Sequence, residues 1–311
     1  MKQTRMNNGG SSVSCMLTPS SLKDELNKLS RYDSSSGSLV SVHADQNIIF
    51  HSLSTHQTTR QIVGFNDEII DATFLSSPLS SSSTQTHLAL ATNSNLIRVY
   101  STSAFDVRLL SGHQDMVLCL DKSMDHQWLV SGSKDQTARI WAPDDEQWRC
   151  IAICEGHAGS VGAVAMSRKG ERRFLFTASQ DRTIKMWDLT SVSSSSAEAG
   201  KPRSLATLRA HEKDINSLDL SPNDRFLASG SQDKLIKIFA VDFYTTNSGP
   251  SGSMKLEGTC KGHRRGVWSV KFSRTDRVVA SGAADRTVRL WSLDDFTCLK
   301  VSQITRHSCH R

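Results

Sequence analysis

The sequence predicts an all-β protein made of repeated four-stranded antiparallel units that are arranged as an incomplete propeller. Three observations support this fold class. One group of residues recurs four times, at a period typical of propeller blades. Within each repeat, short runs rich in β-branched and aromatic residues are separated by turn-forming residues. No stretch within the repeats keeps the apolar spacing of a helix.

The recurring group consists of a histidine, a serine or threonine, an aspartate and an aromatic residue. In the last copy these are His263, Ser281, Asp285 and Trp291. The aspartate always precedes the aromatic residue by six positions, and the serine or threonine precedes the aspartate by four. The other copies contain His113, Ser131, Asp135 and Trp141; His157, Thr177, Asp181 and Trp187; and His211, Ser229 and Asp233 with Phe239.

Histidine, serine and aspartate are also the residues of a hydrolytic triad. A catalytic triad occurs once per active site, whereas this group occurs once per repeat and always beside an aromatic residue. The repetition therefore argues against an enzyme and favours a hydrogen-bond chain that holds each unit together. We predict no catalytic residue, no cofactor and no small-molecule substrate.

The spacing of the repeats defines the predicted blades. Successive histidines are 44, 54 and 52 residues apart, and the longer intervals contain the insertions TSVSSSSAEAGKPR and FYTTNSGPSGS. Without these insertions the period is about 40–45 residues, as in a propeller. We therefore expect four clear blades, over residues 112–155, 156–209, 210–261 and 262–305. A degenerate blade over 64–111 and a partial blade over 35–63 precede them. Residues 1–34 form a Ser-rich and mostly disordered start, and residues 306–311 a divergent tail.

Each blade is expected to contain strands that alternate between two faces. In the last blade, GVWSVKFS predicts Val267, Ser269 and Lys271 on one face. The opposite face would then carry Trp268, Val270 and Phe272.

Composition restricts the compartment and the kind of partner. The 311 residues carry a formal net charge of +6, so an acidic partner such as nucleic acid is plausible. No apolar run approaches membrane-spanning length, and the first residues lack the apolar core of a secretory signal. Seven cysteines without paired spacing favour a reducing, intracellular compartment. Cys150 and Cys154 are read as packing residues, and zinc at the terminal HSCHR is disfavoured, so no metal site is predicted.

Residues 35–305 resemble WD40-repeat β-propellers, a family in which seven blades are usual. The resemblance implies that the histidine, the serine or threonine, the aspartate and the tryptophan form a hydrogen-bond chain in each blade. A buried indole N–H needs an acceptor, and a hydroxyl group can both accept and donate. Phe239 has no N–H, and Ala210 replaces the glycine that usually precedes the histidine. The blade over 210–261 is therefore expected to be less firmly held.

Several strings narrow the resemblance within this family. RQIVGFNDEIID, HEKDINSLDLSPND and KGHRRGVWSV resemble the second propeller of WD40 subunits of the U3 small nucleolar ribonucleoprotein, in the small-subunit processome. That resemblance implies a non-catalytic scaffold in the nucleolus, acting in pre-rRNA processing and small ribosomal subunit biogenesis. Other WD40 subunits would be its partners, and contact with U3 snoRNA or pre-rRNA would be indirect or through phosphates. The alternative is a general WD40 adaptor, for example in a ubiquitin ligase or signalling complex.

Candidate partner-binding residues lie in the loops that project from a propeller face. Arg264 and Arg265 precede a first strand, and Arg182, Lys234 and Arg286 follow the turn aspartates. The segment SRKGERR adds Arg168, Lys169, Arg172 and Arg173 between two strands. Each of these residues, taken singly, is better explained as part of a solvated turn. No aromatic residues are interleaved with them, so any RNA contact is expected to involve phosphates rather than stacked bases.

Overall fold

The structure is a computed structural model of the 311-residue chain. It describes residues 13–17, 38–43, 48–52, 55, 57–62, 68–76, 85–101, 106–144, 147–169, 174–194, 198–247 and 249–303. These residues form strands and turns, and none of them lies in a helix. Within these ranges, no helix is therefore long and apolar enough to cross a membrane.

The described strands form six four-stranded antiparallel sheets, here called blades 1 to 6. Blade 1 comprises β1 (Val13–Leu17), β2 (Ser38–His43), β3 (Ile48–Ser52) and β4 (Thr58–Ile62). Blade 2 comprises β5 (Ile69–Ser76), β6 (Gln85–Thr92), β7 (Ile97–Ser101) and β8 (Val107–Leu110). Blade 3 comprises β9 (Val117–Lys122), β10 (Leu129–Ser133), β11 (Ala138–Asp144) and β12 (Gln147–Cys154). Blade 4 comprises β13 (Val161–Met166), β14 (Phe174–Ser179), β15 (Thr183–Asp188) and β16 (Ser204–Arg209). Blade 5 comprises β17 (Ile215–Leu220), β18 (Phe226–Ser231), β19 (Ile236–Thr246) and β20 (Gly249–Cys260). Blade 6 comprises β21 (Val267–Phe272), β22 (Val278–Ala283), β23 (Thr287–Ser292) and β24 (Cys298–Gln303).

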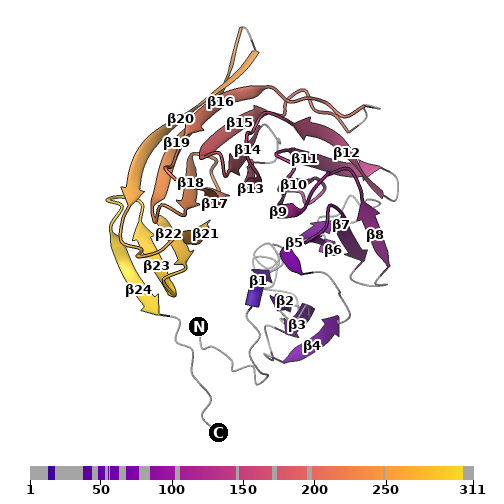
Figure 1. Cartoon of the computed structure of the whole chain (residues 1–311), viewed down its shortest axis with the longest axis horizontal. Helices are drawn as coiled ribbons and strands as arrows, with labels where there is room; N and C mark the ends of the chain where they lie inside the picture. Colours follow the sequence, from indigo (N-terminus) through magenta and orange to yellow (C-terminus); the bar gives the residue numbers. More distant parts are fainter. Residues whose placement is uncertain are drawn as a thin grey trace, which may run out of the picture.

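The six blades follow one another around a common centre, with the first strand of each blade innermost and the fourth outermost (Figure 1). Blades 6 and 1 face each other across an opening in the ring (Figure 1). The predicted all-β propeller with four-stranded antiparallel blades is confirmed, and six blades in an open ring agree with an incomplete propeller.

The hydrophobic core is divided into five clusters, and each cluster lies between two neighbouring blades. The cluster between blades 5 and 6, for example, joins Ile236 and Ile238 to Val267, Val270 and Trp291. A single sheet cannot bury both of its faces, so each blade depends on its neighbours for burial. In the described residues no cluster joins blade 6 to blade 1.

The inner strands do not keep a strict alternation, which corrects the prediction for the last blade. A register shift between Val267 and Ser269 moves the following residues by one position. As a result Val267 and Val270 are both fully buried, while Trp268, Ser269 and Lys271 are all exposed. Similar shifts occur in the inner strands of blades 2 to 5. A bulge places one extra residue in a strand, so the side-chain pattern slips there.

Part of the Ser-rich start forms a strand in the structure. β1 pairs with β2 and completes blade 1 as a four-stranded sheet. The remainder of residues 1–34 lies outside the described residues, as does the tail from 304 to 311. The strand-forming part was missed because five residues among serines give too short a hydrophobic pattern.

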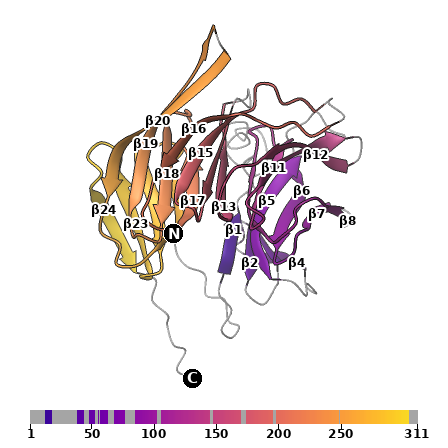
Figure 2. The ribbon, with the colours of Figure 1, turned by 45° about the horizontal axis from the view of Figure 1, so that its top comes forward.

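The insertion after Phe239 forms an extended β-hairpin. β19 and β20 are 11 and 12 residues long and pair from Ile236↔Cys260 to Thr246↔Gly249. The distal part of this hairpin, here called the arm (residues 241–254), projects beyond the ring of blades (Figure 2). Phe243 and Met254 at its base pack against the hydrophobic cluster between blades 4 and 5.

Candidate functional site

The repeated residues form a hydrogen-bond chain within blade 6. His263 Nδ1 lies 3.0 Å from Asp285 Oδ2, and His263 Nε2 lies 2.7 Å from Ser281 Oγ. The indole N–H of Trp291 donates to Ser281 Oγ at 2.8 Å. The equivalent contacts of the groups built on His113 and His157 are between 2.7 and 2.9 Å.

With a neutral histidine, the chemistry of the four groups gives the direction of every bond in the chain. An indole N–H can only donate, so the serine or threonine oxygen accepts it and donates its own proton to histidine Nε2. The other ring nitrogen, Nδ1–H, then donates to the aspartate. A neutral histidine satisfies this arrangement. In blade 4 burial lowers the pKa of His157, which favours the neutral ring despite the Asp181 carboxylate beside it.

A fifth member of the chain was missed in the sequence. The hydroxyls of Thr137, Thr183 and Thr287 donate to Oδ1 of the turn aspartate two residues earlier, at 2.6 to 2.7 Å. Burial alone would raise the pKa of Asp181, but hydrogen bonds from Thr183, His157 and backbone N–H groups outweigh it and lower this pKa to about 2. The signal was present in the sequence as an Asp-x-Thr pattern in three of the four repeats.

Blade 5 keeps most of the chain despite its two departures. His211 lies 2.8 Å from Asp233 Oδ2 and 2.7 Å from Ser229 Oγ, and the indole link and the threonine hydroxyl link are missing. At Gly112 and Gly262 of other blades, an added Cβ would lie 3.3 Å from the tryptophan ring and 2.6 Å from an arginine nitrogen, whereas at Gly156 of blade 4 no atom would lie within 4 Å of it. A tryptophan in the blade therefore does not by itself exclude alanine at this position.

The hydroxyls of these chains are not placed for chemistry on a substrate. Ser131, Thr177, Ser229 and Ser281 are at most 2% exposed. In blades 3, 4 and 6 the oxygen also already contacts both the histidine and the indole. The arrangement therefore joins the segment that precedes the first strand to the second and third strands of the blade, and it closes the turn between the second and third.

A second set of polar residues links one blade to the next along the inner strands. Asp71 Oδ2 accepts the backbone N–H of Leu120 at 2.8 Å, across blades 2 and 3. Asp121 accepts from Met166 at 2.8 Å, and Asp219 accepts from Phe272 at 2.7 Å. The role of these residues could not be predicted from the sequence, because their partners lie 45 to 53 positions away.

One predicted surface cation belongs to this inner network instead. Blade 4 has Ala165 where blades 3 and 5 have Asp121 and Asp219. Arg168 lies between those two carboxylates, 3.3 and 3.4 Å from their oxygens, and its side chain is only 23% exposed. Lys271 of blade 6 also contacts Asp219, at 3.0 Å. Arg168 is therefore an internal bridge rather than a solvated residue, while Arg172 and Arg173 lie outside the described residues.

The five candidate partner-binding cations lie at the end of the blades that carries the turn aspartates, here called the turn face. Arg182, Lys234 and Arg286 occupy the tight turns of blades 4, 5 and 6, with φ of 70°, 75° and 61°. Arg264 and Arg265 precede β21, and the Arg264 N–H donates to Asp285 at 2.9 Å. All five are exposed.

The turn-face loops of neighbouring blades touch one another. The backbone oxygen of Arg182 accepts from Ala210 at 3.0 Å, and an added Cβ at Gly266 would lie 3.1 Å from Gln232. The five cations therefore belong to adjoining loops over blades 4 to 6. In blade 3, by contrast, Lys134 forms an ion pair with Asp115 at 3.7 Å. Among the described residues, none of the five cations has such a partner.

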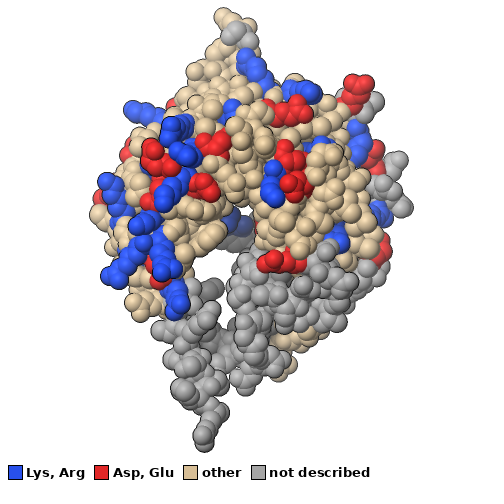
Figure 3. Space-filling view, in the orientation of Figure 1, with Lys and Arg blue, Asp and Glu red and all other residues tan. Residues whose placement is uncertain are grey.

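Positive charge is concentrated toward the end of the chain. Residues 254–303 contain ten Lys and Arg but five Asp and Glu. Figure 3 shows Lys and Arg side chains gathered over the part of the molecule that Figure 1 draws in orange and yellow. Trp268 of blade 6, on the innermost strand, is 58% exposed.

Among the residues that the structure describes, no group of three or more His, Cys, Asp or Glu could hold a metal ion. Cys154 is buried and Cys150 partly so; burial raises the pKa of both thiols, which opposes the thiolate form that binds metals. The terminal HSCHR lies outside the described residues.

Comparison with known proteins agrees with this geometry. The mouse transducin beta-like protein 3 is 38% identical over 240 residues, which are 75% of this chain and 28% of the mouse protein. The yeast U3 small nucleolar RNA-associated protein 13 is 34% identical over 230 residues, which are 70% of this chain and 26% of that protein. A ribosome biogenesis protein WDR12 homolog from Drosophila yakuba is 29% identical over 189 residues, or 58% of this chain and 42% of that homolog.

The chain thus spans about a quarter to two-fifths of the length of these relatives. The WD40 family, described as WD domain, G-beta repeat, matches residues 105–142, 148–188, 202–239 and 254–292. Each match ends within or close to the third strand of a blade, at or near the aromatic residue of the repeated group. These four matches cover half of the chain and show that it belongs to the WD40 family.

Proposed function

We propose that the chain is a non-catalytic scaffold of the U3 small nucleolar ribonucleoprotein, within the small-subunit processome. It would act in the nucleolus, in pre-rRNA processing and small ribosomal subunit biogenesis. The names of the relatives support this proposal, since they refer to U3 small nucleolar RNA and to ribosome biogenesis. Other WD40 subunits of the processome are the proposed protein partners.

The observation that carries the proposal is the unpaired positive charge of the turn face. Arg182, Lys234, Arg264, Arg265 and Arg286 are exposed, and in the described residues no acidic side chain forms an ion pair with them. Three of them also adopt a positive φ, a conformation that costs free energy for any residue other than glycine. Phosphates of RNA, or acidic segments of partner proteins, are suitable counter-charges.

The test reverses the charge of blade 6 on this face. The variant Arg264→Glu, Arg265→Glu and Arg286→Glu should fold like the original chain, because exposed substitutions away from special features usually change stability little. We expect less of the tagged variant to co-sediment with pre-ribosomal particles on a sucrose gradient. Raising the salt concentration should lower co-sedimentation of the original chain, since exposed charges are screened.

A matched control applies the same charge change elsewhere. Lys255→Glu, Arg277→Glu and Lys300→Glu alter three exposed cations of blades 5 and 6 outside the turn face. Only Arg277 loses an ion pair, with Asp294, and exposed pairs contribute about 0–1 kcal/mol. The control should co-sediment like the original chain. If both triple variants co-sediment with pre-ribosomal particles to the same extent, the turn face does not contact the particle. If the original chain instead co-purifies with ubiquitin-ligase or signalling subunits, the function of a general adaptor is favoured.

A further inference from the structure

Strand β19 continues past its inner neighbour and leaves one edge open. β18 pairs with β19 as far as Phe226↔Ala240, and Val241 N–H donates to the Arg225 oxygen at 2.8 Å. Beyond this point β19 continues to Thr246 with β20 as its only partner in the described sheets. The inner edge of the arm is therefore available for another strand.

The register shows which backbone groups face this open edge. In an antiparallel strand, the N–H and C=O of alternate residues point to the same side. Since Val241 N–H points toward β18, the N–H and C=O of Phe243 and Thr245 point to the open edge. The residue opposite Thr245 is Pro250 of β20, which has no N–H. Because the Thr245 N–H points away from β20, the pairing between the two strands of the arm does not use it.

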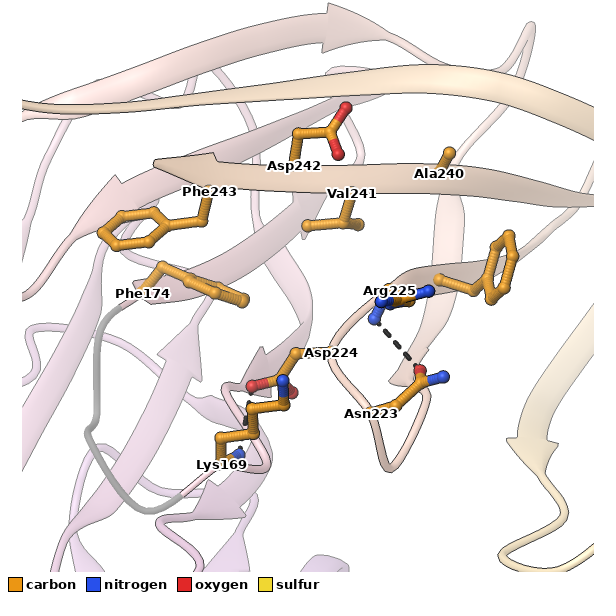
Figure 4. Close-up of a pocket in the computed structure, with 10 residues that line it drawn as sticks. Lys169, Phe174, Asn223, Asp224, Arg225, Ala240, Val241, Asp242 and Phe243 are labelled. Carbon is orange, nitrogen blue, oxygen red and sulfur yellow. Dashed lines mark hydrogen bonds between the residues drawn. The ribbon is translucent and has the colours of Figure 1, made fainter. Parts of the chain in front are cut away.

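A cavity of about 370 Å³ lies beside this edge, between blades 4 and 5. Its apolar walls include Phe174 from β14, Phe226 from β18, and Val241 and Phe243 from β19. The rings of Phe174 and Phe243 lie 5.3 Å apart and are tilted by 40° (Figure 4). The cavity is at the small end of the range of ligand sites, about 300–1,000 Å³, and suits one large apolar side chain.

The charged groups around the cavity favour an acidic occupant. Lys169 and Arg225 are exposed at its rim and have no ion pair in the part of the chain that the structure describes. Asp224 is already engaged, because its carboxylate accepts the backbone N–H groups of Arg168 and Lys169 at 2.6 and 3.0 Å. Asp242 projects from the opposite side of β19 (Figure 4). Lys169 and Arg225 are thus the two exposed charged side chains on the cavity side, beside the partly buried carboxylate of Asp224.

We propose that this groove binds an extended acidic peptide segment of a partner protein. The segment adds to the open edge of β19 as a further strand, with its backbone hydrogen-bonded to Phe243 and Thr245. One apolar side chain enters the cavity between Phe174 and Phe243, and neighbouring carboxylates contact Lys169 and Arg225. The groove lies at the end of the blades opposite the turn face, so this interaction is separate from the function proposed above.

The test uses a fluorescein-labelled peptide of alternating leucine and glutamate residues, followed by fluorescence anisotropy. Thr245→Pro removes one N–H from the open edge, while Thr245→Ala keeps it and serves as the matched control. Loss of one hydrogen bond predicts about tenfold weaker binding for the proline variant and no change for the alanine variant. Lys169→Glu combined with Arg225→Glu should also weaken binding of this peptide. A peptide of alternating leucine and lysine should bind poorly.

Amide hydrogen exchange provides a measurement on the unaltered chain, in case the proline variant fails to fold. Exchange at Phe243 and Thr245 should slow when the leucine–glutamate peptide is added. Absence of peptide binding, equal affinities of the two Thr245 variants, or unchanged exchange at both residues would overturn the proposal. So would displacement of the peptide by single-stranded oligouridylate, because that result would assign the groove to RNA.

Discussion

At the scale of single residues, the turn aspartates should differ in their contribution to stability. Asp181 accepts hydrogen bonds from the His157 ring, the Thr183 hydroxyl and two backbone N–H groups. Asp233 has no hydroxyl donor, because Leu235 occupies the threonine position. Replacing either aspartate with alanine should lower the free energy of unfolding by about 1–3 kcal/mol, since buried donors lose their acceptor. Asp181→Ala should have the larger effect.

Urea unfolding measured by fluorescence would compare these two variants. Equal losses would argue against a role for the threonine and the tryptophan in strengthening the chain. The same assay separates the structural interpretation from a catalytic one. Ser229→Ala should lower stability, and an esterase activity that disappears in this variant would contradict the structural interpretation.

Buried histidines should make the fold sensitive to mild acid. Burial, reinforced by nearby cations, lowers the pKa of His126 to about 3, and burial lowers the pKa of His157. In the unfolded chain both would titrate near 6.5, so unfolding takes up protons below that pH. The free energy of unfolding should therefore fall as the pH drops from 7 toward 4. Asp71 acts in the opposite direction, because burial raises its pKa to about 6.

A single substitution isolates the histidine contribution. His126 has a φ of 59°, which asparagine tolerates better than most residues. His126→Asn should flatten the dependence of the unfolding free energy on pH between 6.5 and 4. Urea titrations at several pH values would measure the slope, and an unchanged slope would assign the acid sensitivity to other groups.

At the scale of one strand, substitution of equivalent glycines by alanine should have different effects, depending on whether another blade lies beside the glycine. Gly132 and Gly230 occupy the second strands of blades 3 and 5, and each faces the next blade. A Cβ added there would come within 2.8 Å of Val161 of blade 4 and 2.8 Å of Val267 of blade 6, respectively. At the same position of blade 6, Gly282 has no atom within 4 Å of the added Cβ.

Alanine substitutions would therefore report on the neighbouring blade. Gly132→Ala and Gly230→Ala should lower the free energy of unfolding by about 1–3 kcal/mol through overpacking. Gly282→Ala should be neutral or stabilising by up to about 1 kcal/mol, because alanine loses less backbone entropy on folding. Thermal unfolding of the three variants would test this ranking. If Gly282→Ala lowers the free energy of unfolding, another segment of the chain or a second molecule covers this sheet in solution.

At the scale of the whole molecule, the open ring should promote self-association. Blade 6 exposes Trp268 to 58%, and β24 adds Leu299 and Val301, exposed to 58% and 49%. Exposed apolar side chains at both edges of this sheet favour contact with another chain. We expect sedimentation velocity to show association that increases with protein concentration.

Substitution of Trp268 should identify the surface responsible. Trp268→Ser should reduce the associated fraction, whereas Tyr244→Ser, which alters a side chain of the arm that is 51% exposed, should leave it unchanged. A monodisperse, cooperatively unfolding monomer of the original chain would contradict the expectation. It would show that the open blades do not need a partner.

The sequence by itself determined the all-β class, the repeated blade and the group of His113, Ser131, Asp135 and Trp141 with its three relatives. These features could be predicted because every contact of the chain joins residues of the same blade, at most 26 positions apart. The period of the pattern therefore corresponds directly to a structural unit. The Asp-x-Thr contact was within the same reach and was overlooked.

Only the tertiary structure decided how the blades meet and which residues remain free. Arg168 could be read as a surface cation until the ring placed it between Asp121 and Asp219, 47 and 51 positions away. The bulge that exposes Trp268 and the open edge at Thr245 depend on strand register. A pattern of polar and apolar residues shows which strands exist, but their partners on the next blade are set by the packing of whole sheets.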